Sequence, residues 1–393
     1  MISFWINVFF ATFFAKKNKL ILNEPKSLAI IFDEAIGDYI LFRNFLKTIR
    51  ESKKYSDYKI TFICNSIVKE LVLFLDSEYI DNYIWIDIAK LKKNTLYRYY
   101  TLISLSHLCF TELLIPSDSR NVLTSDMLAL AIQSEKKVSM ITSKRNIGEN
   151  IWDKKQSEIT QKWYTNLLPV DYSNVKFAFD IRRIIISSII EEKINDKCPE
   201  IILPPNYELP IHIEGKYIVW ALGASSKQRL WSTNHILETI NYILNKSDYY
   251  ILITGGLKDN RLATEVMKKI DGNNKHRVLN YCGKITLIDM LYLINKSNII
   301  IGNDSCAIHM AMALEATGAQ KEVFIIFPGK VFTRFVPYPL ELSEKYHVIA
   351  HPEFEEKIIT GMVKYDIFLN LTDTYPTSEI PATNLINYLN MYL

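Results

Sequence analysis

The chain has 393 residues, 49% of them apolar, and is therefore long enough for two domains that each bury a hydrophobic core. It carries 46 Lys and Arg against 43 Asp and Glu, and this net charge of +3 argues against a nucleic-acid-binding protein. The five cysteines lie far apart and form no CxxC pair, which predicts a reducing, cytoplasmic setting without disulfides or a cysteine metal site.

Residues 1–26 form a leader that is apolar at first and then basic. Its first part is rich in Phe and carries Trp5, and three lysines follow within residues 16–19. The apolar stretch is shorter than the roughly 20 residues of a membrane-spanning helix, and no basic segment precedes it, as in a secretory signal. Two arrangements remain open. Either residues 1–20 lie on the inner face of the cytoplasmic membrane, or the leader covers the first domain or a partner chain.

Residues 27–210 are predicted to form the first domain, in which strands and helices alternate. An apolar strand at 28–32 is followed by the turn DEAIGD and an amphipathic helix from about Asp38 to Arg50. Further predicted strands lie at 59–64, 83–87, 111–115 and 137–141. This alternation predicts a mostly parallel, doubly wound sheet. The prolines between 199 and 210 are typical of an interdomain linker.

Residues 211–375 repeat the alternation and are predicted to form a second domain of the same class. Helix starts are indicated by Ser232 as an N-cap and by a capping box formed by Thr286 and Asp289. The predicted strands lie at 217–221, 249–254, near 278, at 299–301 and, as the last one, at 323–327. A final amphipathic helix is predicted within residues 376–393. The expected fold is therefore α/β, with two Rossmann-like domains that each contain a doubly wound parallel sheet.

Several common motifs are absent from the sequence. It contains no GxGxxG after the first strand of either domain, no GxxxxGK[ST] loop, no HExxH and no DxD triplet. The first two absences argue against a nicotinamide cofactor and a P-loop nucleotide site. The others give no indication of a bound metal ion. We therefore predict neither a cofactor nor a metal.

Four polar stretches remain, and each follows a predicted strand. They lie at 33–38, 223–231, 255–259 and 302–309. Open α/β sheets bind their ligands at the carboxyl ends of the strands, and two facing sheets would form a cleft there. The three stretches of the second domain combine hydroxyls, cations, a glycine pair and a helix N-terminus. These groups suit a pyrophosphate, which needs backbone donors, hydroxyl donors and a fixed positive charge.

The same stretches resemble glycosyltransferase family 9, which includes the lipopolysaccharide heptosyltransferases and has the GT-B fold. The similar segments are LAIIFDEAIGDYILF, YIVWALGASSKQRLWS, ITGGLKD and NDSCAIHMAMAL. The last is the most specific, because it is similar to the family's Asp-Ser/Thr-Gly-x-x-His-x-Ala signature. Cys306 departs from that signature by replacing its usual glycine, and FPGK inverts the family's Gly-Pro turn. These departures concern the identity of the sugar rather than the fold.

The resemblance implies a metal-independent, inverting glycosyltransferase. Its donor would be a nucleotide-diphospho-sugar, with ADP-heptose as one candidate, and its acceptor a lipopolysaccharide or another surface glycan. Asp38 matches the family's catalytic base, and Asp33 is the weaker candidate, which also suits a turn-shaping role. The implied donor-binding residues lie in the second domain: Ser225, Ser226, Lys227, Arg229, Gly255, Gly256, Asp259, Asp304, Ser305, Cys306 and His309.

Structural roles compete with these assignments. Asp38 and Asp259 also suit stabilisation of a helix first turn. A lone His on an apolar helix favours a bracing role for His309 behind the residues that touch the donor. Residues 144–168, with Trp152, Trp163 and Tyr164, offer stacking faces for a sugar or an aromatic core.

Two other functions remain open at this point. One is a sugar-nucleotide epimerase of the same two-domain fold, which needs no acceptor. The other is a non-catalytic nucleotide-sugar-binding protein held at the membrane by its leader.

Overall fold

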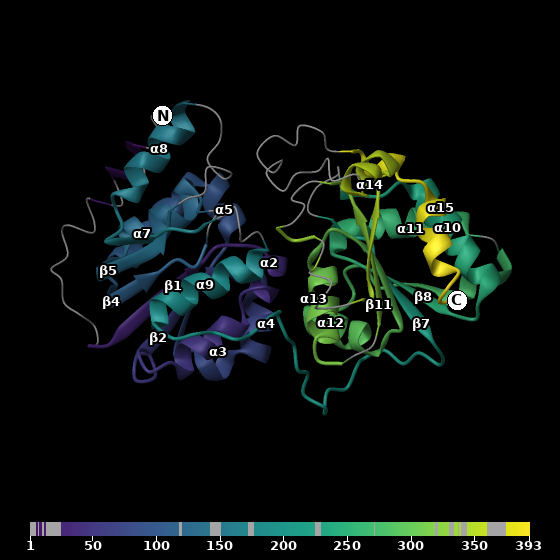
Figure 1. Ribbon diagram of the computed structural model, residues 1–393, viewed down its shortest axis with the longest axis horizontal. Coiled ribbons are helices and arrows are strands. Elements are labelled where there is room, and N and C mark those ends of the chain that lie inside the picture. Colours follow the sequence, from purple (N-terminus) through teal and green to yellow (C-terminus); the bar gives the residue numbers. More distant parts are fainter. Residues whose placement is uncertain are drawn as a thin grey trace. The chain divides into compact units, whose positions relative to one another are not determined.

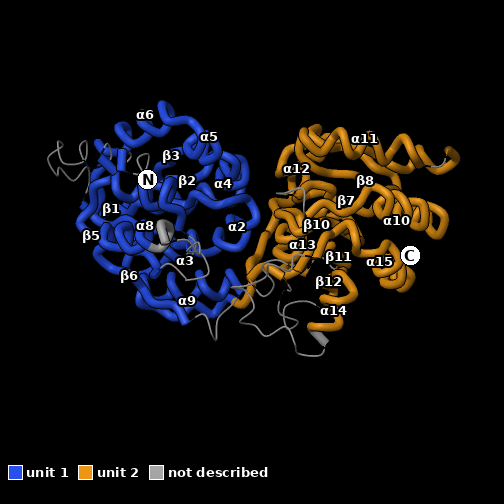
Figure 2. The backbone as a smooth tube through the Cα atoms, turned by 90° about the horizontal axis from the view of Figure 1, so that it is seen from above, with its two compact units in different colours: residues 1–196 blue, residues 197–393 orange. Residues whose placement is uncertain are grey.

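The computed structural model describes residues 5–6, 8–9, 12, 25–117, 120–141, 151–171, 177–224, 229–270, 272–318, 321–329, 334–336, 338, 344–359 and 375–393. Contacts divide the chain into two compact units, residues 1–196 and 197–393 (Figure 2). The division falls just before the proline-rich stretch that the sequence predicts as a linker.

Unit 1 contains a six-stranded parallel sheet in the order β3-β2-β1-β4-β5-β6, flanked by helices (Figure 1). Its strands are β1 Ser27–Phe32, β2 Lys59–Asn65, β3 Asn82–Ile86, β4 Cys109–Leu114, β5 Gln133–Met140 and β6 Asn166–Leu168. Its α-helices are α2 Ile36–Ile40, α3 Asn44–Glu51, α4 Lys69–Leu75, α5 Ile88–Lys93, α6 Thr95–Ser106, α7 Met127–Ala131, α8 Ile151–Gln161 and α9 Ala178–Ile190. Short helices lie at η1 Ser66–Val68, η2 Ser77–Tyr79 and η3 Val122–Asp126.

The single helix predicted after β1 is in fact two, α2 and α3. At the break between them, the backbone forms hydrogen bonds between residues i and i−3, from Phe42 N to Tyr39 O (3.0 Å) and from Phe45 N to Phe42 O (2.9 Å). Two side chains next to this break, Tyr39 and Arg43, bind the buried carboxylate of Asp76. Arg43 donates to Asp76 through Nη2 (2.8 Å) and Nε (3.1 Å), and the Tyr39 hydroxyl donates to it as well. A buried charge needs such partners, and these contacts fix α2 against the unit.

Unit 2 contains a second six-stranded parallel sheet, in the order β12-β11-β10-β7-β8-β9. Its strands are β7 Tyr217–Ala221, β8 Tyr250–Thr254, β9 Val278–Asn280, β10 Ile299–Asn303, β11 Glu322–Phe327 and β12 Tyr346–Ala350. Its α-helices are α10 Thr233–Lys246, α11 Asn260–Lys269, α12 Leu287–Lys296, α13 Cys306–Glu315, α14 Pro352–Ile359 and α15 Ala382–Leu389. Short helices lie at η5 Leu257–Asp259, η6 Gly272–Arg277 and η8 Thr377–Glu379.

The helix starts of unit 2 confirm the capping predictions. Ser232 Oγ accepts from His235 N (3.2 Å) at the start of α10, and Thr286 and Asp289 form the predicted capping box of α12. The prediction that the strand at 323–327 is the last one is wrong, because β12 follows it. β12 is a five-residue strand that pairs with β11 in parallel, and a hydrogen bond between the His347 imidazole and the Glu322 carboxylate (2.8 Å) joins the two strands. The pairing that makes residues 346–350 a strand therefore depends on β11, not on the sequence of these residues alone.

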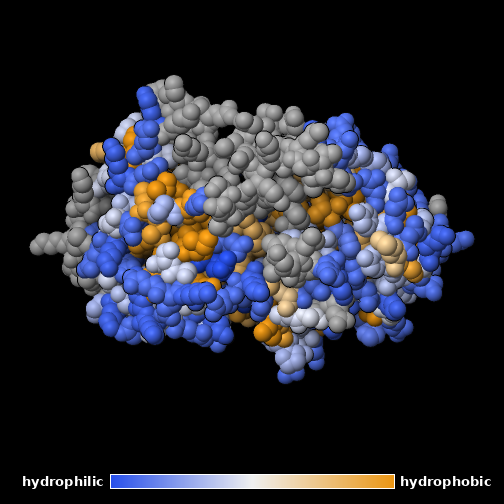
Figure 3. Space-filling view, viewed as in Figure 1, coloured by the Kyte–Doolittle hydropathy of each residue, from blue (hydrophilic) through white to orange (hydrophobic). Residues whose placement is uncertain are grey.

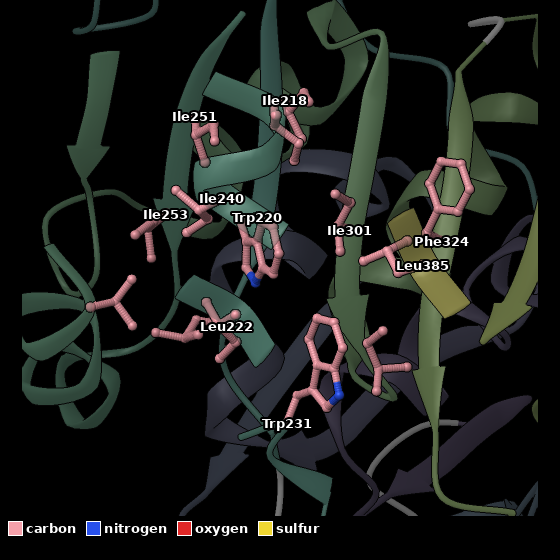
Figure 4. Packing of buried hydrophobic residues seen from close by; sticks show 14 of the residues in the cluster. Ile218, Trp220, Leu222, Trp231, Ile240, Ile251, Ile253, Ile301, Phe324 and Leu385 are labelled. Atoms are coloured by element: carbon pink, nitrogen blue, oxygen red, sulfur yellow. The ribbon is translucent and has the colours of Figure 1, made fainter. Parts of the chain in front are cut away.

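The core of unit 2 ties the C-terminal segment to the sheet (Figure 4). Leu385 of α15 lies with Phe324 and Ile301 beside the two indole rings of Trp220 and Trp231. Those rings stack at 6.4 Å between centroids, and Trp231 Nε1 donates to Ile380 O (2.8 Å). Residues near Trp231 are therefore held between the sheet and the end of the chain.

The described surface is largely hydrophilic on the face shown in Figure 3, where hydrophobic side chains gather in separate patches. Among the described residues, no helix has both the length and the apolar character needed to cross a membrane.

One buried cation makes the stability of unit 2 sensitive to pH. Lys321 precedes β11, is fully buried, and its ammonium has no hydrogen-bond partner among the described residues. Burial lowers its pKa from 10.5 to about 8. Between these two values the unfolded chain holds a proton that the folded chain lacks, so the free energy of unfolding should rise with pH across this window.

We therefore expect Lys321→Met to stabilise the protein at pH 7 by about 2 kcal/mol and to remove the rise in stability above pH 8. Urea unfolding between pH 7 and 10.5 measures both effects. Lys216→Met is the matched control, because Lys216 also precedes a strand of this sheet but is exposed. A destabilised Lys321→Met protein at pH 7 would contradict the expectation.

Candidate functional site

The turn after β1 is held by side chains from three neighbouring segments. Asp33 accepts hydrogen bonds from Ser125 N (3.1 Å) and Ser125 Oγ (2.7 Å), and also from the Thr124 hydroxyl, all in η3. Glu34 O accepts from Asn65 Nδ2 (3.0 Å) at the end of β2, and Glu34 Oε1 accepts from Ser117 Oγ (2.6 Å) after β4. Asp33 therefore shapes the turn through its Oδ2.

Asp38 lies in the first turn of α2, and its side chain is 21% exposed. Arg182 of α9 contacts it twice, from Nη1 to Asp38 O (3.1 Å) and from Nη2 to Asp38 Oδ1 (3.3 Å). The same Nη2 pairs with Glu34 Oε2 (2.5 Å). Within the described part of the chain, Oδ2 of Asp38 makes no hydrogen bond or ion pair. Asp38 thus combines one held oxygen with one that is available to a ligand.

The sequence interpretation did not include Arg182, although the sequence contains a signal for it. In the isoleucine-rich helix α9, the buried residues recur every three or four positions, and Arg182 falls in this apolar stripe rather than on the polar side. An arginine in such a stripe requires an acidic partner, because a lone buried charge is strongly unfavourable.

The loop after β7 carries the predicted cation Arg229. Its Nη1 lies 2.9 Å from Asp304 Oδ2, and the Asp304 side chain is 4% exposed. The structure therefore brings two predicted site residues together, from the loops after β7 and β10. Three others predicted for this loop, Ser225, Ser226 and Lys227, lie outside the described residues.

Asn303, which the sequence interpretation missed, joins the same two loops. Its Nδ2 donates to Leu222 O (2.9 Å), and its Oδ1 accepts from Trp231 N (3.2 Å). Asn303 is buried at the end of β10, where its amide must find partners. A polar residue that follows three buried isoleucines after a single glycine was the available signal.

The glycine pair after β8 is shaped by Asp259. Asp259 Oδ2 accepts from Gly256 N (2.8 Å), and the residue is 8% exposed. A Cβ atom at Gly223 or Gly255 would lie 2.7 or 2.9 Å from that oxygen, too close for an ordinary contact. Lys258 Nζ adds a hydrogen bond to Ala224 O (2.8 Å). A side chain at either position would therefore require the Asp259 carboxylate to shift, so glycine allows the two loops to approach each other with Asp259 in this place.

The helix α13 begins at this edge of the sheet. Ser305 is its N-cap residue and has extended backbone (φ −151°), but its side chain makes no capping hydrogen bond. Cys306 follows and is partly exposed, and burial of its thiol raises its pKa to about 11. The thiol is therefore neutral at physiological pH. The rest of the helix is buried up to Leu314, so its N-terminal amides form its polar end.

His309 lies one turn further along α13 and is buried. Its Nδ1 is 2.9 Å from the hydroxyl of Tyr338, whose pKa is raised by burial, so the phenol stays neutral. The imidazole also meets the ring of Phe335 edge-on at 5.9 Å. These contacts suit the bracing role that the apolar helix favours for His309.

The described residues of unit 2 thus place a cation, a helix N-terminus and a glycine turn along one edge of a parallel sheet. Unit 1 places a carboxylate with one available oxygen at the corresponding edge of its own sheet. No cluster of three or more His, Cys, Asp or Glu that is suited to a metal ion occurs in the described ranges. Such groups can bind a diphosphate and accept a proton.

The fold is similar to that of several solved structures. Among solved structures, a family 9 glycosyl transferase from Veillonella parvula is similar, with a TM-score of 0.64, 15% identity and coverage of 94% of this chain and 98% of that chain. The E. coli ADP-heptose lps heptosyltransferase II has a TM-score of 0.63 and 14% identity, with coverage of 93% of this chain and 98% of that chain. E. coli heptosyltransferase WaaC with ADP has a TM-score of 0.62 and 11% identity, with coverage of 93% of this chain and 97% of that chain.

These likenesses confirm the predicted fold class, two α/β units of the GT-B type. No curated protein sequence matches the chain. The family model described as glycosyltransferase family 9 (heptosyltransferase) matches residues 118–317, about half of the chain. The chain belongs to glycosyltransferase family 9 and is a glycosyltransferase.

Proposed function

We propose that this enzyme transfers heptose from ADP-heptose to a lipopolysaccharide acceptor, without a metal and with inversion at the anomeric carbon. One similar structure is described as WaaC with ADP and another as WaaC with ADP-2-deoxy-2-fluoro heptose, which makes ADP-heptose the first donor to test. The observation that carries the proposal is the geometry of Asp38. One of its carboxylate oxygens is held by Arg182, while the other is available to an acceptor hydroxyl.

In the proposed reaction, unit 1 binds the acceptor and unit 2 binds the donor. Asp38 Oδ2 takes the proton of the acceptor hydroxyl as that oxygen forms a bond to the anomeric carbon. The bond from the anomeric carbon to the β-phosphate oxygen breaks, and the nucleotide diphosphate leaves with the electron pair. Attack opposite to the leaving group inverts the configuration.

The charge on the departing diphosphate would be stabilised in unit 2. Arg229 pairs with Asp304 through Nη1 (2.9 Å), and we assign the other donors of its guanidinium to a phosphate oxygen. Ser305 and Cys306 would present the N-terminal amides of α13 to the same group. Asp259 would hold the turn at Gly255 and Gly256 against the nucleotide.

The remaining assignments follow the same division. Three residues from the loop after β7 would add hydroxyl and cationic donors to the phosphates: Ser225, Ser226 and Lys227. His309 would brace the donor site from behind through Tyr338.

Replacing Asp38 tests the base. We expect Asp38→Asn to lower kcat by about 10³-fold, because the amide cannot accept the proton. Binding of ADP, measured by calorimetry, should be unchanged, because Asp38 lies outside unit 2. Asp57→Asn, which changes an exposed carboxylate of unit 1, should keep full turnover. Undiminished turnover of Asp38→Asn would remove Asp38 from the mechanism.

Replacing Arg229 tests the diphosphate site. We expect Arg229→Met to raise the Kd for ADP about 10- to 100-fold, because a charge-assisted hydrogen bond to phosphate is lost, while AMP binding changes less. The control is Arg261→Met, in which an exposed arginine of α11 is changed. Equal losses for ADP and AMP would place Arg229 away from the β-phosphate.

Acceptor dependence separates transfer from epimerisation and from binding alone. With ADP-heptose alone, we expect the sugar to remain unaltered, and with the cell's own glycolipid extract we expect ADP release and a heavier glycolipid by mass spectrometry. An altered sugar without acceptor would favour the epimerase. Donor binding without any turnover would favour a non-catalytic protein.

We also propose that residues 1–20 hold the enzyme on the inner face of the cytoplasmic membrane. Trp5 and Phe9 are 51% and 60% exposed, whereas Val8 packs against the core of unit 1. Exposed aromatic rings of this kind suit the headgroup region of a bilayer.

Vesicle binding tests this contact. We expect the double variant Trp5→Ser with Phe9→Ser to sediment at least about fivefold less with phosphatidylglycerol vesicles, while its activity on a soluble acceptor is unchanged. The control Leu96→Ser alters an exposed leucine of α6 instead. Equal sedimentation of the double variant and the parent would contradict membrane contact through the leader.

A further inference from the structure

Arg182 is more deeply buried than either carboxylate that it contacts. Its side chain is 2% exposed, against 10% for Glu34 and 21% for Asp38. A buried guanidinium needs one carboxylate to balance its charge, and Glu34 Oε2 at 2.5 Å meets that need. The contacts to Asp38 therefore exceed what burial of the arginine requires.

Those extra contacts restrict Asp38 in a specific way. Two nitrogens of the planar Arg182 guanidinium donate to Asp38: Nη1 to its main-chain oxygen (3.1 Å) and Nη2 to its side-chain Oδ1 (3.3 Å). A planar donor that grips backbone and carboxylate together restricts rotation of the side chain between them. Arg182 cannot follow a moving Asp38, because Glu34 is itself held by Ser117 Oγ (2.6 Å).

We infer that Arg182 is a positioning residue for glycosyl transfer: it fixes Asp38 Oδ1 so that Oδ2 faces the acceptor hydroxyl. This inference rests on the proposed role of Asp38 as the base. When the acceptor O–H bond breaks and the proton passes to Oδ2, the group formed by Glu34, Asp38 and Arg182 changes from one net negative charge to none. Arg182 keeps its own charge and geometry throughout.

Substitutions of Arg182 should therefore change kcat rather than binding. We expect Arg182→Met to lower kcat about 100-fold, because the reacting oxygen loses its fixed orientation, with KM for both substrates within about twofold. Arg182→Lys keeps the charge without the two-nitrogen grip and should recover about tenfold of that loss. Arg183→Met, which changes the neighbouring half-exposed arginine that pairs with Asp180, should keep the parent's kcat.

A double-mutant cycle tests whether Arg182 acts through Asp38. In the Asp38→Asn background, Arg182→Met should lower kcat by less than about twofold further, because the group that it positions no longer accepts a proton. ADP affinity and the thermal midpoint report folding for each variant. If Arg182→Met does not fold, the same cycle is run with Arg182→Lys.

Two outcomes would overturn the inference: a full additional loss in the Asp38→Asn background, or an Arg182→Lys enzyme with the parent's kcat. Normal turnover of Asp38→Asn alone would instead refute the proposed base, so the two failures are distinguishable.

Discussion

Hydrogen bonds from buried side chains to the backbone hold the loops at the carboxyl edge of both sheets. A parallel sheet ends all its strands on one side, and the loops that follow carry polar backbone groups that need partners there. In unit 2, Asn303 and Asp259 supply them by binding Leu222 O and Trp231 N, and Gly256 N. The described parts of these loops are therefore held without a ligand, which limits the ordering that binding requires there.

The charges in the two units follow different arrangements. In unit 2, Arg229 and Asp304 form one pair, in which the cation remains 22% exposed and the carboxylate lies beneath it. In unit 1 the arginine lies beneath and the carboxylate is the more exposed partner. The more exposed member of the pair is thus the cation in unit 2 and the carboxylate in unit 1. A cation suits a diphosphate, and a carboxylate suits a hydroxyl that must lose its proton.

The sequence predicts those parts of the fold that depend on local interactions. Apolar runs predict β1 and β10, and the cap at Ser232 and the capping box at Thr286 depend on residues three positions apart. Parts that depend on distant residues were missed or misread. The contact between Arg182 and Glu34 joins residues 148 positions apart, and β12 is a strand because β11 lies beside it. Apolar periodicity identifies a buried arginine but not its partner.

The packing of Trp231 also has a consequence for the order of events during synthesis. Trp231 Nε1 binds Ile380 O, and the Thr377 hydroxyl binds Leu230 O, so the segment that carries Arg229 rests on residues made almost 150 positions later. A ribosome releases the chain from its N-terminal end first. The last contacts of that segment therefore form only after Thr377 and Ile380 have been made, and a chain terminated before them would lack this support for the segment that carries Arg229.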